Sequence, residues 1–309
     1  MLKIMICVNP NKDKEMSNTR KLLDFLKNYN VTVLMSDIFK RPYFDSPPLS
    51  QTLLCGYKIE YLPEYAAFKK ADICFVFGGD GTIIKVAKKI AQAGGYILGF
   101  NMGRVGYLAE LEVSEIELLH ELLSIDDISQ VESINGLSID ARMMIKCEII
   151  RGDKVVFTTN ALNEVVISKG AVSRMAGLNL TCNGKNIISY RADGIIISTP
   201  TGSTAYCMSA GGPIIDPALD CICAVPVCPY LCLNNGAVVF SSDSVIDVKF
   251  TADKINEAFC TVDGKITKSI YDGDIVRITK AQGGIKLIRI KDIDFYSRLN
   301  DKMNLVNNI

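Results

Sequence analysis

The chain has 309 residues, of which 49% are hydrophobic, and its 34 lysines and arginines equal its 34 aspartates and glutamates in number. This balance gives no reason to expect nucleic acid or an anionic membrane as a partner, and no apolar run reaches the roughly 20 residues needed to cross a bilayer. The 11 cysteines lack the spacing of a disulfide framework, and the N-terminal residues are not typical of a signal peptide. The sequence therefore predicts a reduced, cytoplasmic protein with a small-molecule or protein partner.

The first 125 residues or so alternate apolar strands with amphipathic helices. We expect strands at residues 2–8, 31–35, 71–77 and 94–100. A helix is predicted at residues 17–29, where leucines and a phenylalanine form an apolar face, and a second helix is expected to begin near Thr82. Continuous apolar strands that alternate with helices predict a parallel sheet covered on both faces.

The pattern changes from about Gly136, where short β-rich runs are divided by Gly, Asp and Asn turns. The predicted fold class is α/β, with an N-terminal open parallel-sheet α/β domain at residues 1–137 and a β-rich, largely antiparallel C-terminal domain at residues 138–289. The charged, helix-like tail at residues 290–309 is expected to join the first domain.

The stretch GGDGT lies between a predicted strand and a predicted helix, at residues 78–82. Glycine permits positive φ and lets backbone N–H groups approach a ligand closely, and the carboxyl end of a strand is where open α/β sheets bind phosphates. The predicted phosphate-binding loop consists of Gly78, Gly79, Gly81 and Thr82. The pattern is neither a Walker A loop nor a Gly-x-Gly-x-x-Gly dinucleotide fingerprint. In the alternative interpretation, the glycines form a tight turn and Asp80 or Thr82 caps the helix.

A second polar stretch, YRADGIIISTPTGSTAYCMSAGGPIIDP, follows at residues 190–217. Hydroxyl groups are unusually dense in it, at Thr199, Thr201, Ser203, Thr204 and Ser209. Such groups suit a polar ligand with many donors and acceptors, and Tyr206 offers an aromatic face to a base. The alternative is a hairpin loop rich in serine and threonine.

Taken together, these stretches resemble the NAD kinases of bacterial type. The matching motifs are GGDGT at 78–82, NMGRVGYL at 101–108, NEVVI at 163–167 and DGIIISTPTGSTAYCMSAGGP at 193–213. They occur in the family's order and approximate spacing, and the resemblance covers most of residues 72–264. Diacylglycerol and sphingosine kinases share the first motif but lack the Thr-Pro-Thr-Gly-Ser-Thr-Ala-Tyr block.

The resemblance implies transfer of a phosphoryl group from ATP, or in some members polyphosphate, to the 2'-hydroxyl of the adenosine ribose of NAD. Mg²⁺ or another divalent cation would accompany the donor phosphates. By the same resemblance, Asp80 is the catalytic residue that accepts the proton of the hydroxyl, and the adjacent glycines lie along phosphates. Family members form dimers or tetramers, so we expect a homodimer or homotetramer.

The resemblance also implies a set of NAD-binding residues. They are Gly81, Asn163, Glu164, Arg191, Asp193, Thr201, Thr204, Ala205, Tyr206 and Ser209. An adjacent amide and carboxylate such as Asn163 and Glu164 can donate to and accept from ribose hydroxyls or the adenine. Asp193 would accept from the nicotinamide carboxamide, and Arg191 would add a positive charge near the same site.

The chain departs from the family pattern in the stretch CPYLCLNNGAVV. Tyr230 stands where the family commonly has histidine, and Asn235-Gly236 stands where it has Arg-Pro. The single histidine of the chain, His120, lies in a predicted helix and is interpreted as a surface residue, so histidine-based acid–base chemistry is not expected.

Four cysteines, at positions 221, 223, 228 and 232, are close enough in the chain to suggest zinc. They lack a paired C-x2-C spacing and lie in an apolar run, so buried thiols are favoured and no metal ligand is predicted in the chain itself.

Two other functions stay open at this point. One is a lipid kinase of the diacylglycerol or sphingosine type, which would need an apolar entry for acyl chains. The other is a non-catalytic NAD-binding sensor that has kept the fold. The hydroxyl-rich block argues against the first, and the intact Asp80 argues against the second.

Overall fold

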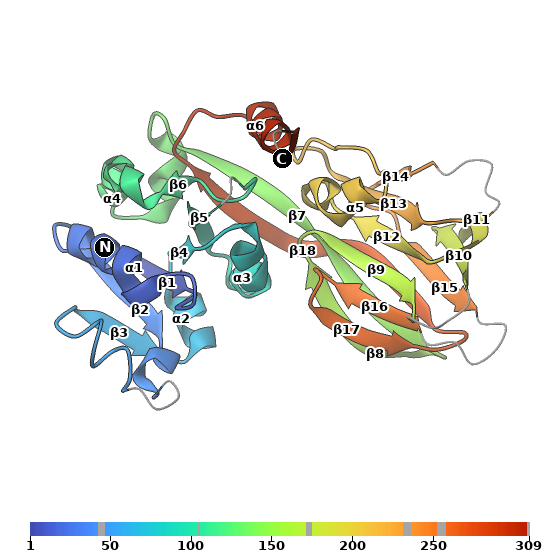
Figure 1. The fold of residues 1–309 in the computed structure, drawn as a ribbon, viewed down its shortest axis with the longest axis horizontal. Helices are drawn as coiled ribbons and strands as arrows, with labels where there is room; N and C mark the ends of the chain where they lie inside the picture. The colour runs from blue at the N-terminus through green and yellow to red at the C-terminus, as the bar shows by residue number, and fades with distance from the viewer. Residues whose placement is uncertain (43–46, 104–105, 171–174, 231–235, 252–257, 308–309) are drawn as a thin grey trace. The chain divides into compact units, whose positions relative to one another are not determined.

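The structure, a computed structural model, describes residues 1–42, 47–103, 106–170, 175–230, 236–251 and 258–307 (Figure 1). It divides into two compact units, one made of Met1–Ala141 with Ile285–Ile309 and the other of Arg142–Gly284. Two long strands, β7 (Ser138–Arg151) and β18 (Ile275–Arg289), run from one unit into the other. The domain boundaries proposed from the sequence fall at the start of β7 and at the end of β18.

The first unit is built on a parallel sheet. Its strands, in the order in which they pair, are β3 (Ile59–Leu62), β2 (Val31–Ser36), β1 (Leu2–Val8), β4 (Ile73–Phe77) and β5 (Tyr96–Asn101), with the two-residue β6 (Leu111–Glu112) and the end of β18 also parallel to β5. Every residue of β4 is buried, as expected for a strand covered on both faces. The predicted open parallel sheet is confirmed.

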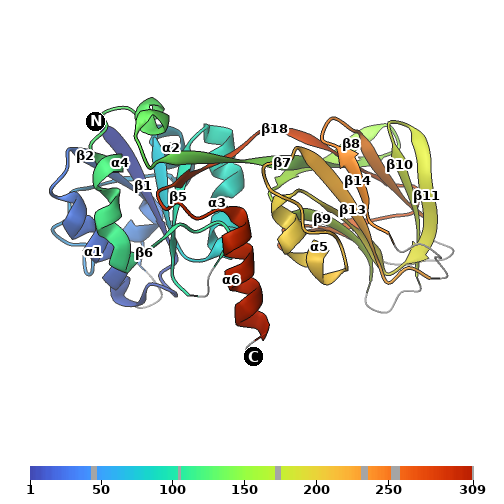
Figure 2. The same ribbon diagram turned by 90° about the horizontal axis from the view of Figure 1, so that it is seen from above.

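Helices cover both faces of this sheet. The α-helices of the unit are α1 (Ser17–Leu26), α2 (Glu64–Lys70), α3 (Asp80–Ala93), α4 (His120–Leu123) and α6 (Phe295–Asn307), and its 3-10 helices are η1 (Lys14–Met16), η2 (Asp37–Lys40), η3 (Val113–Leu119) and η4 (Ile128–Ser133). Figure 2 shows α1 and α4 on one side of the strands and α2 and α3 on the other. Helix α1 ends three residues before its predicted end, because residues 27–30 form turns in which Tyr29 N–H donates to the Leu26 carbonyl.

The second unit contains two antiparallel sheets. The six-stranded sheet has the order β14 (Val238–Ser241), β13 (Cys221–Val227), β12 (Gly194–Ser198), β9 (Glu164–Lys169), β16 (Ala258–Val262) and β17 (Ile266–Ile270). The other sheet has the order β11 (Lys185–Ala192), β10 (Ala176–Cys182), β15 (Ile246–Thr251) and β18, with β7 paired to β18 and to β8 (Lys154–Ala161). One apolar core draws side chains from both sheets, so the sheets pack face to face.

The outer face of the six-stranded sheet is also covered next to β12. Helix α5 (Tyr206–Ser209) contributes Cys207 to a small apolar cluster with Ile196 and Val225. Strand β12 is therefore buried on both faces, which explains its continuous apolar sequence GIIIS. Helix α5 and the preceding η5 (Thr201–Thr204) are the helices that the described residues of this unit form. Among the described residues, no helix is both long and apolar enough to cross a membrane.

A buried carboxylate anchors the start of α1. Asp13 is 1% exposed, its Oδ1 accepts from Asn18 N at 2.9 Å, and its Oδ2 accepts from Thr19 N at 2.9 Å and Thr19 Oγ1 at 2.6 Å. These N–H groups belong to the first turn of the helix, where no intrahelical partner exists.

Replacing Asp13 with alanine is expected to lower the free energy of unfolding by about 1–3 kcal/mol, because buried helix donors lose their acceptor. The measurement is chemical denaturation, with Asp126→Ala as the matched control, since the Asp126 side chain is 90% exposed. Equal stability of the two variants would show that the Asp13 contacts contribute nothing.

Candidate active site

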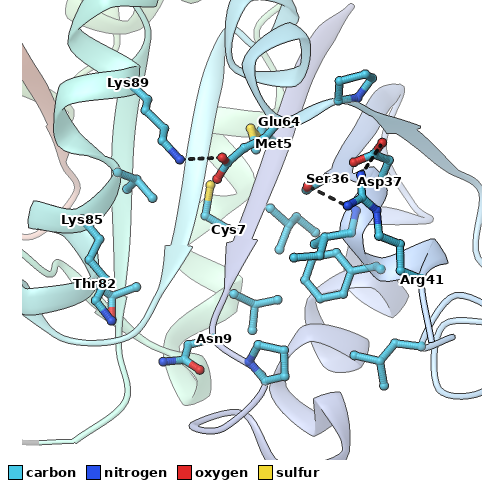
Figure 3. A pocket seen from close by; sticks show the side chains of 18 of the residues that line it. Met5, Cys7, Asn9, Ser36, Asp37, Arg41, Glu64, Thr82, Lys85 and Lys89 are labelled. Atoms are coloured by element: carbon cyan, nitrogen blue, oxygen red, sulfur yellow. Dashed lines mark hydrogen bonds and ion pairs between the residues drawn. The ribbon is translucent and has the colours of Figure 1, made fainter. Parts of the chain in front are cut away.

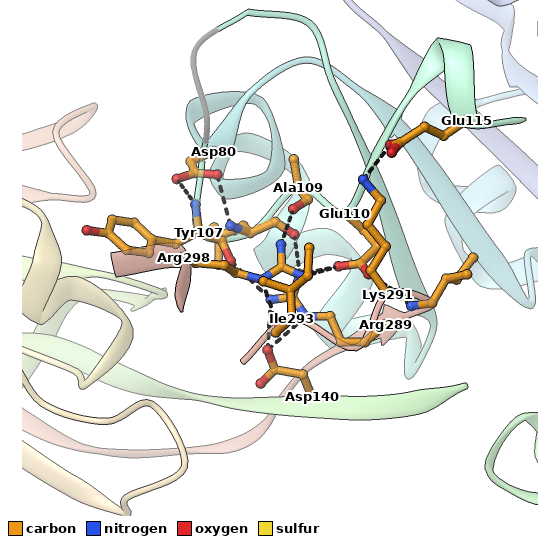
Figure 4. Close-up of polar contacts among 12 residues, drawn as sticks. Asp80, Tyr107, Ala109, Glu110, Glu115, Asp140, Arg289, Lys291, Ile293 and Arg298 are labelled. Carbon is orange, nitrogen blue, oxygen red and sulfur yellow. Dashed lines mark hydrogen bonds and ion pairs between the residues drawn. The ribbon is translucent and has the colours of Figure 1, made fainter. Parts of the chain in front are cut away.

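Asp80 is the first residue of α3, but its side chain does not cap the helix. The N-cap residue is Gly79, with no capping hydrogen bond from a side chain. The carboxylate of Asp80 turns instead toward the segment that follows β5, where Oδ2 accepts from Tyr107 N at 2.9 Å and Oδ1 accepts from Leu108 N at 3.0 Å (Figure 4). The capping interpretation of Asp80 is therefore wrong. Each carboxylate oxygen keeps acceptor capacity for one more donor.

Two glycines of the site are required by the fold. A Cβ on Gly106 would lie 2.2 Å from Asp80 Oδ1, and a Cβ on Gly78 would lie 2.2 Å from the Oγ1 of the buried Thr82. In contrast, a Cβ on Gly79 or Gly81 would meet no atom within 4 Å. Packing within the protein does not demand glycine at these two positions, and the open space leaves their backbone accessible to a ligand.

A positive charge lies close to the same segment. The ammonium group of Lys302, in α6, lies 3.9 Å from the centroid of the Tyr107 ring. Burial lowers the pKa of Lys302, and the negative charge of Asp80 opposes that shift. The surroundings of Asp80 thus combine two backbone donors with a partly buried cation.

A pocket of about 930 Å³ opens next to the glycine loop within the first unit (Figure 3). Its lining residues follow the carboxyl ends of four neighbouring parallel strands, at Asn9 after β1, Ser36 at the end of β2, Pro63 after β3 and Thr82 after β4. Ligands bind to open α/β sheets at these strand ends. The sequence did not reveal this pocket, because its walls come from four separate segments.

The charges that line this pocket are mostly paired. Lys89 Nζ lies 2.5 Å from Glu64 Oε2, and Arg41 lies 3.6 Å from Asp37. Lys85, one turn into α3, is exposed and has no ion pair among the described residues (Figure 3). The pocket therefore presents one uncompensated cation beside Thr82, which suits an anionic ligand.

In the second unit, Glu164 is a buried carboxylate with an unused acceptor. Its side chain accepts from Tyr206 N–H, but Oε2 is buried without a hydrogen-bond partner among the described residues. Burial, followed by the negative charge of Asp263, raises the pKa of Glu164 to about 7. A buried polar atom without a partner is costly, so this oxygen indicates a place for a ligand donor.

Asp263 holds the Asn163-Glu164 segment in place. This carboxylate accepts from the backbone N–H groups of Leu162, Asn163 and Glu164 at 2.8–3.2 Å. Burial nevertheless raises the pKa of Asp263. Sequence reasoning missed this residue; the one available signal was the Asp-Gly turn at 263–264, where Asp263 has a φ of 47°.

The hydroxyl groups of the 199–204 stretch are largely used inside the protein. Thr199 Oγ1 donates to Leu162 O at 2.6 Å and accepts from Gly202 N, Ser203 Oγ bonds the backbone of Ile215, and Thr204 Oγ1 donates to Thr201 O. Thr201 Oγ1 accepts from Arg142 at 3.3 Å. These bonds hold the stretch against Leu162 and Asn163. Beyond the end of this stretch, Tyr206 and Ser209 are exposed.

The predicted NAD-binding residues of the second unit form two groups. Asn163 and Glu164 lie beside the 201–206 stretch, because Ser198, at the end of β12, pairs with Glu164. Asp193 lies at the opposite end of the five-residue β12, about 16 Å away along the strand. Asp193 pairs there with Lys169 at 3.4 Å. The fold of one chain therefore does not bring Asp193 next to Tyr206.

Arg191 and the stretch that departs from the family pattern lie at this second end of β12. Tyr230 is 56% exposed, and its N–H donates to Arg191 O at 2.8 Å. Asn235 of this stretch and Arg104 of the 101–108 motif lie outside the described residues.

The outcomes for the cysteines and the histidine are as follows. Cys221 and Cys223 are buried in β13, Cys228 is exposed, and Cys232 is not among the described residues. His120 is exposed and hydrogen-bonded to Tyr29 and Glu117.

Comparison with known proteins agrees with this geometry. Residues 4–128 match the family model of the ATP-NAD kinase N-terminal domain, and residues 162–290 match that of the ATP-NAD kinase C-terminal domain. An NAD kinase of Acetivibrio thermocellus is 34% identical over 303 residues, which cover 98% of this chain and 97% of the relative. An NAD kinase of Thermoanaerobacter sp. (strain X514) is 33% identical over 303 residues, with 98% and 99% covered.

Two solved structures share the fold. Yeast NADH kinase complexed with NADH has a TM-score of 0.81 at 21% identity, with 98% of this chain and 88% of that chain covered. An NAD kinase from Archaeoglobus fulgidus in complex with ATP has a TM-score of 0.68 at 23% identity, with both chains covered to 100%. These similarities confirm the predicted fold class.

The chain belongs to the NAD kinase family and is an enzyme that phosphorylates NAD to NADP. This membership decides against the lipid kinase and against the non-catalytic sensor.

The raised pKa of Glu164 gives a testable pH dependence. The folded protein binds a proton at this residue more tightly than the unfolded chain, so its contribution to stability is full below about pH 4.5 and is lost as the pH rises through about 7. Glu164→Gln stays neutral, so its melting temperature relative to wild type is expected to rise from about pH 5 to about pH 8. Thermal unfolding across this range is the measurement. A constant difference in melting temperature between Glu164→Gln and wild type across this range would contradict the raised pKa of Glu164.

Proposed function

We propose that Asp80 is the group that accepts the proton of the NAD 2'-hydroxyl during phosphoryl transfer. The observation that carries this assignment is the fixed orientation of its carboxylate by Tyr107 N–H and Leu108 N–H. Phosphoryl transfer depends mainly on positioning and on charge neutralisation, so a carboxylate in a fixed orientation suits the role. Gly79 and Gly81, which have open space around them, would let phosphates approach the backbone.

NAD would bind through the first group of residues in the second unit. The free Oε2 of Glu164 would accept from a ribose hydroxyl or the adenine amino group, and the exposed ring of Tyr206 would stack on a base. The remaining members of this proposed group are Asn163, Thr201, Thr204, Ala205 and Ser209. Thr201 and Thr204 would act chiefly by shaping the site, because their hydroxyls already have partners in the protein.

The donor would occupy the pocket beside the glycine loop. This pocket offers room for a nucleotide, the strand-end position typical of phosphate sites and the cation of Lys85. A divalent cation would accompany the donor phosphates, whose charge it would neutralise. ATP is the donor favoured by the pocket and by the family, and polyphosphate is the alternative.

A homodimer or homotetramer would explain the position of Arg191 and Asp193. These residues lie at the far end of β12 from Glu164, so a second copy of the chain would supply them to a complete NAD site. The cytoplasmic location and the two domains at 1–137 with 290–309 and at 138–289 stay predictions.

The first test is NADP formation by the purified protein with NAD, Mg²⁺ and either ATP or polyphosphate. Asp80→Asn is expected to lower kcat by at least about 100-fold, because the variant cannot accept the proton. The dissociation constant for NAD, measured by calorimetry, should change by less than about twofold, since Asp80 acts on the reacting hydroxyl rather than on the bulk of the ligand. Wild-type turnover in Asp80→Asn would refute the assignment.

The donor pocket is tested with two lysines of the same helix. Lys85→Ala is expected to raise the KM for ATP by about 5- to 30-fold and to leave the KM for NAD unchanged, because one charge-assisted contact to phosphate is lost. Lys88→Ala is the matched control, since Lys88 does not line the pocket. Equal effects of both substitutions on the KM for ATP would place the donor elsewhere.

A further inference from the structure

The segment that binds Asp80 is itself held by two arginines from the C-terminal part of the chain (Figure 4). Arg289, the last residue of β18, donates from Nη2 to Tyr107 O at 3.0 Å and from Nη1 to Leu108 O at 3.2 Å. Arg298, in α6, donates from Nη1 to Ala109 O at 3.1 Å. Three successive carbonyl groups thus have guanidinium partners.

One peptide group connects Arg289 directly to Asp80. In the peptide group between Tyr107 and Leu108, the N–H of Leu108 donates to Asp80 Oδ1, and the carbonyl of Tyr107 accepts from Arg289 Nη2. Because a peptide group is planar, fixing its carbonyl also fixes the direction of its N–H. A cation at the carbonyl further polarises the group and makes its N–H a stronger donor. Arg289 therefore acts on the carboxylate through a single rigid unit.

Arg289 is in turn held firmly. Its side chain is 9% exposed, and it contacts Glu110 Oε2 at 3.0 Å and Asp140 Oδ2 at 2.8 Å. The side chain of Glu110 is fully buried, and its Oε2 also accepts from Arg298 at 2.6 Å. Its Oε1 accepts from the N–H groups of Ile290 and Lys291. Two arginines and two carboxylates balance in charge, and a buried network that is fully satisfied is rigid.

We propose that Arg289 is a positioning residue for phosphoryl transfer: through the peptide between Tyr107 and Leu108, it fixes the carboxylate of Asp80 in the orientation that the reaction requires. Glu110 and Asp140 fix Arg289. This proposal rests on the role of Asp80 proposed above. Arg289 does not touch the substrates in this arrangement, so its effect falls on the chemical step rather than on NAD binding.

Arg289→Lys tests the proposal, because lysine keeps the charge but cannot bridge two carbonyls and two carboxylates at once. We expect kcat, expressed per NAD-binding site counted by calorimetry, to fall by about 10- to 100-fold through misorientation of the base. The dissociation constant for NAD and the KM for ATP should stay within about twofold. In the Asp80→Asn background, the same substitution should have no further effect on kcat.

A matched control separates positioning from general destabilisation. Arg277→Lys also breaks an arginine–aspartate pair with two hydrogen bonds, to Asp247 at 2.8 Å, but lies in β18 within the second unit. It should lower the melting temperature without changing kcat per site. If Arg289→Lys does not fold, Asp140→Asn is tested in its place. This substitution weakens one of the two carboxylate contacts of Arg289, at a partly exposed position. The loss of kcat should be smaller and should likewise disappear in the Asp80→Asn background.

The outcomes distinguish this proposal from the function itself. A fall in kcat per site that disappears in the Asp80→Asn background supports the positioning role. Unchanged kcat per site in the Arg289 variant, with a large loss in Asp80→Asn, overturns the positioning role and leaves the proposed base intact. An equal loss in both backgrounds also overturns it, because Arg289 would then act independently of Asp80. Wild-type turnover in Asp80→Asn would remove the basis of both proposals.

Discussion

The hydrogen bonds from two successive backbone N–H groups to the carboxylate of Asp80 are the constraint on which the candidate site of the first unit depends. Asp80 follows the carboxyl end of strand β4, and the segment that binds it follows the carboxyl end of the neighbouring parallel strand β5. Gly106 must lack a side chain because the carboxylate fills the space that a Cβ would need. Arg289 at the end of β18 and Arg298 in helix α6 bind the carbonyl groups of that segment. Residues near the C-terminus of the chain therefore support a candidate site that is built from residues 78–109.

In the second unit, the main feature of the candidate site is the buried carboxylate of Glu164. Asp263 fixes the backbone around Glu164 with three hydrogen bonds. One oxygen of Glu164 has no hydrogen-bond partner in the part of the chain that the structure describes. Burying such an atom destabilises the free protein. A ligand that donates a hydrogen bond to this oxygen would relieve that cost, and part of the free energy of binding would then come from satisfying the buried carboxylate.

The hydroxyl groups after β12 have a structural role that composition alone did not reveal. Thr199, Ser203 and Thr204 hold the stretch in shape through bonds to backbone atoms, and Gly202 lies so close to the Asn163 carbonyl that a Cβ would be 2.2 Å from that oxygen. Close packing against neighbouring backbone therefore restricts which residues this stretch can contain. Each of these hydroxyls keeps part of its hydrogen-bonding capacity, and Tyr206 at the end of the stretch is exposed.

The sequence by itself determined the features that depend on neighbouring residues. The apolar run at residues 2–8 is strand β1 with the same limits, and the glycine loop at 78–82 could be located because strand, turn and helix signals adjoin each other. The Asp80 interpretation stayed open in the sequence, since an aspartate after glycine is also a good helix cap.

The tertiary structure excluded the capping interpretation of Asp80, because the donors to its carboxylate lie 27 and 28 residues further along the chain and the arginine behind them lies at position 289. The pocket at the ends of four strands was hidden in the sequence for the same reason. So was the Glu164 oxygen for which the described residues offer no hydrogen-bond partner. Local patterns record backbone preference and burial, whereas hydrogen bonds between distant segments follow only from how the strands pack.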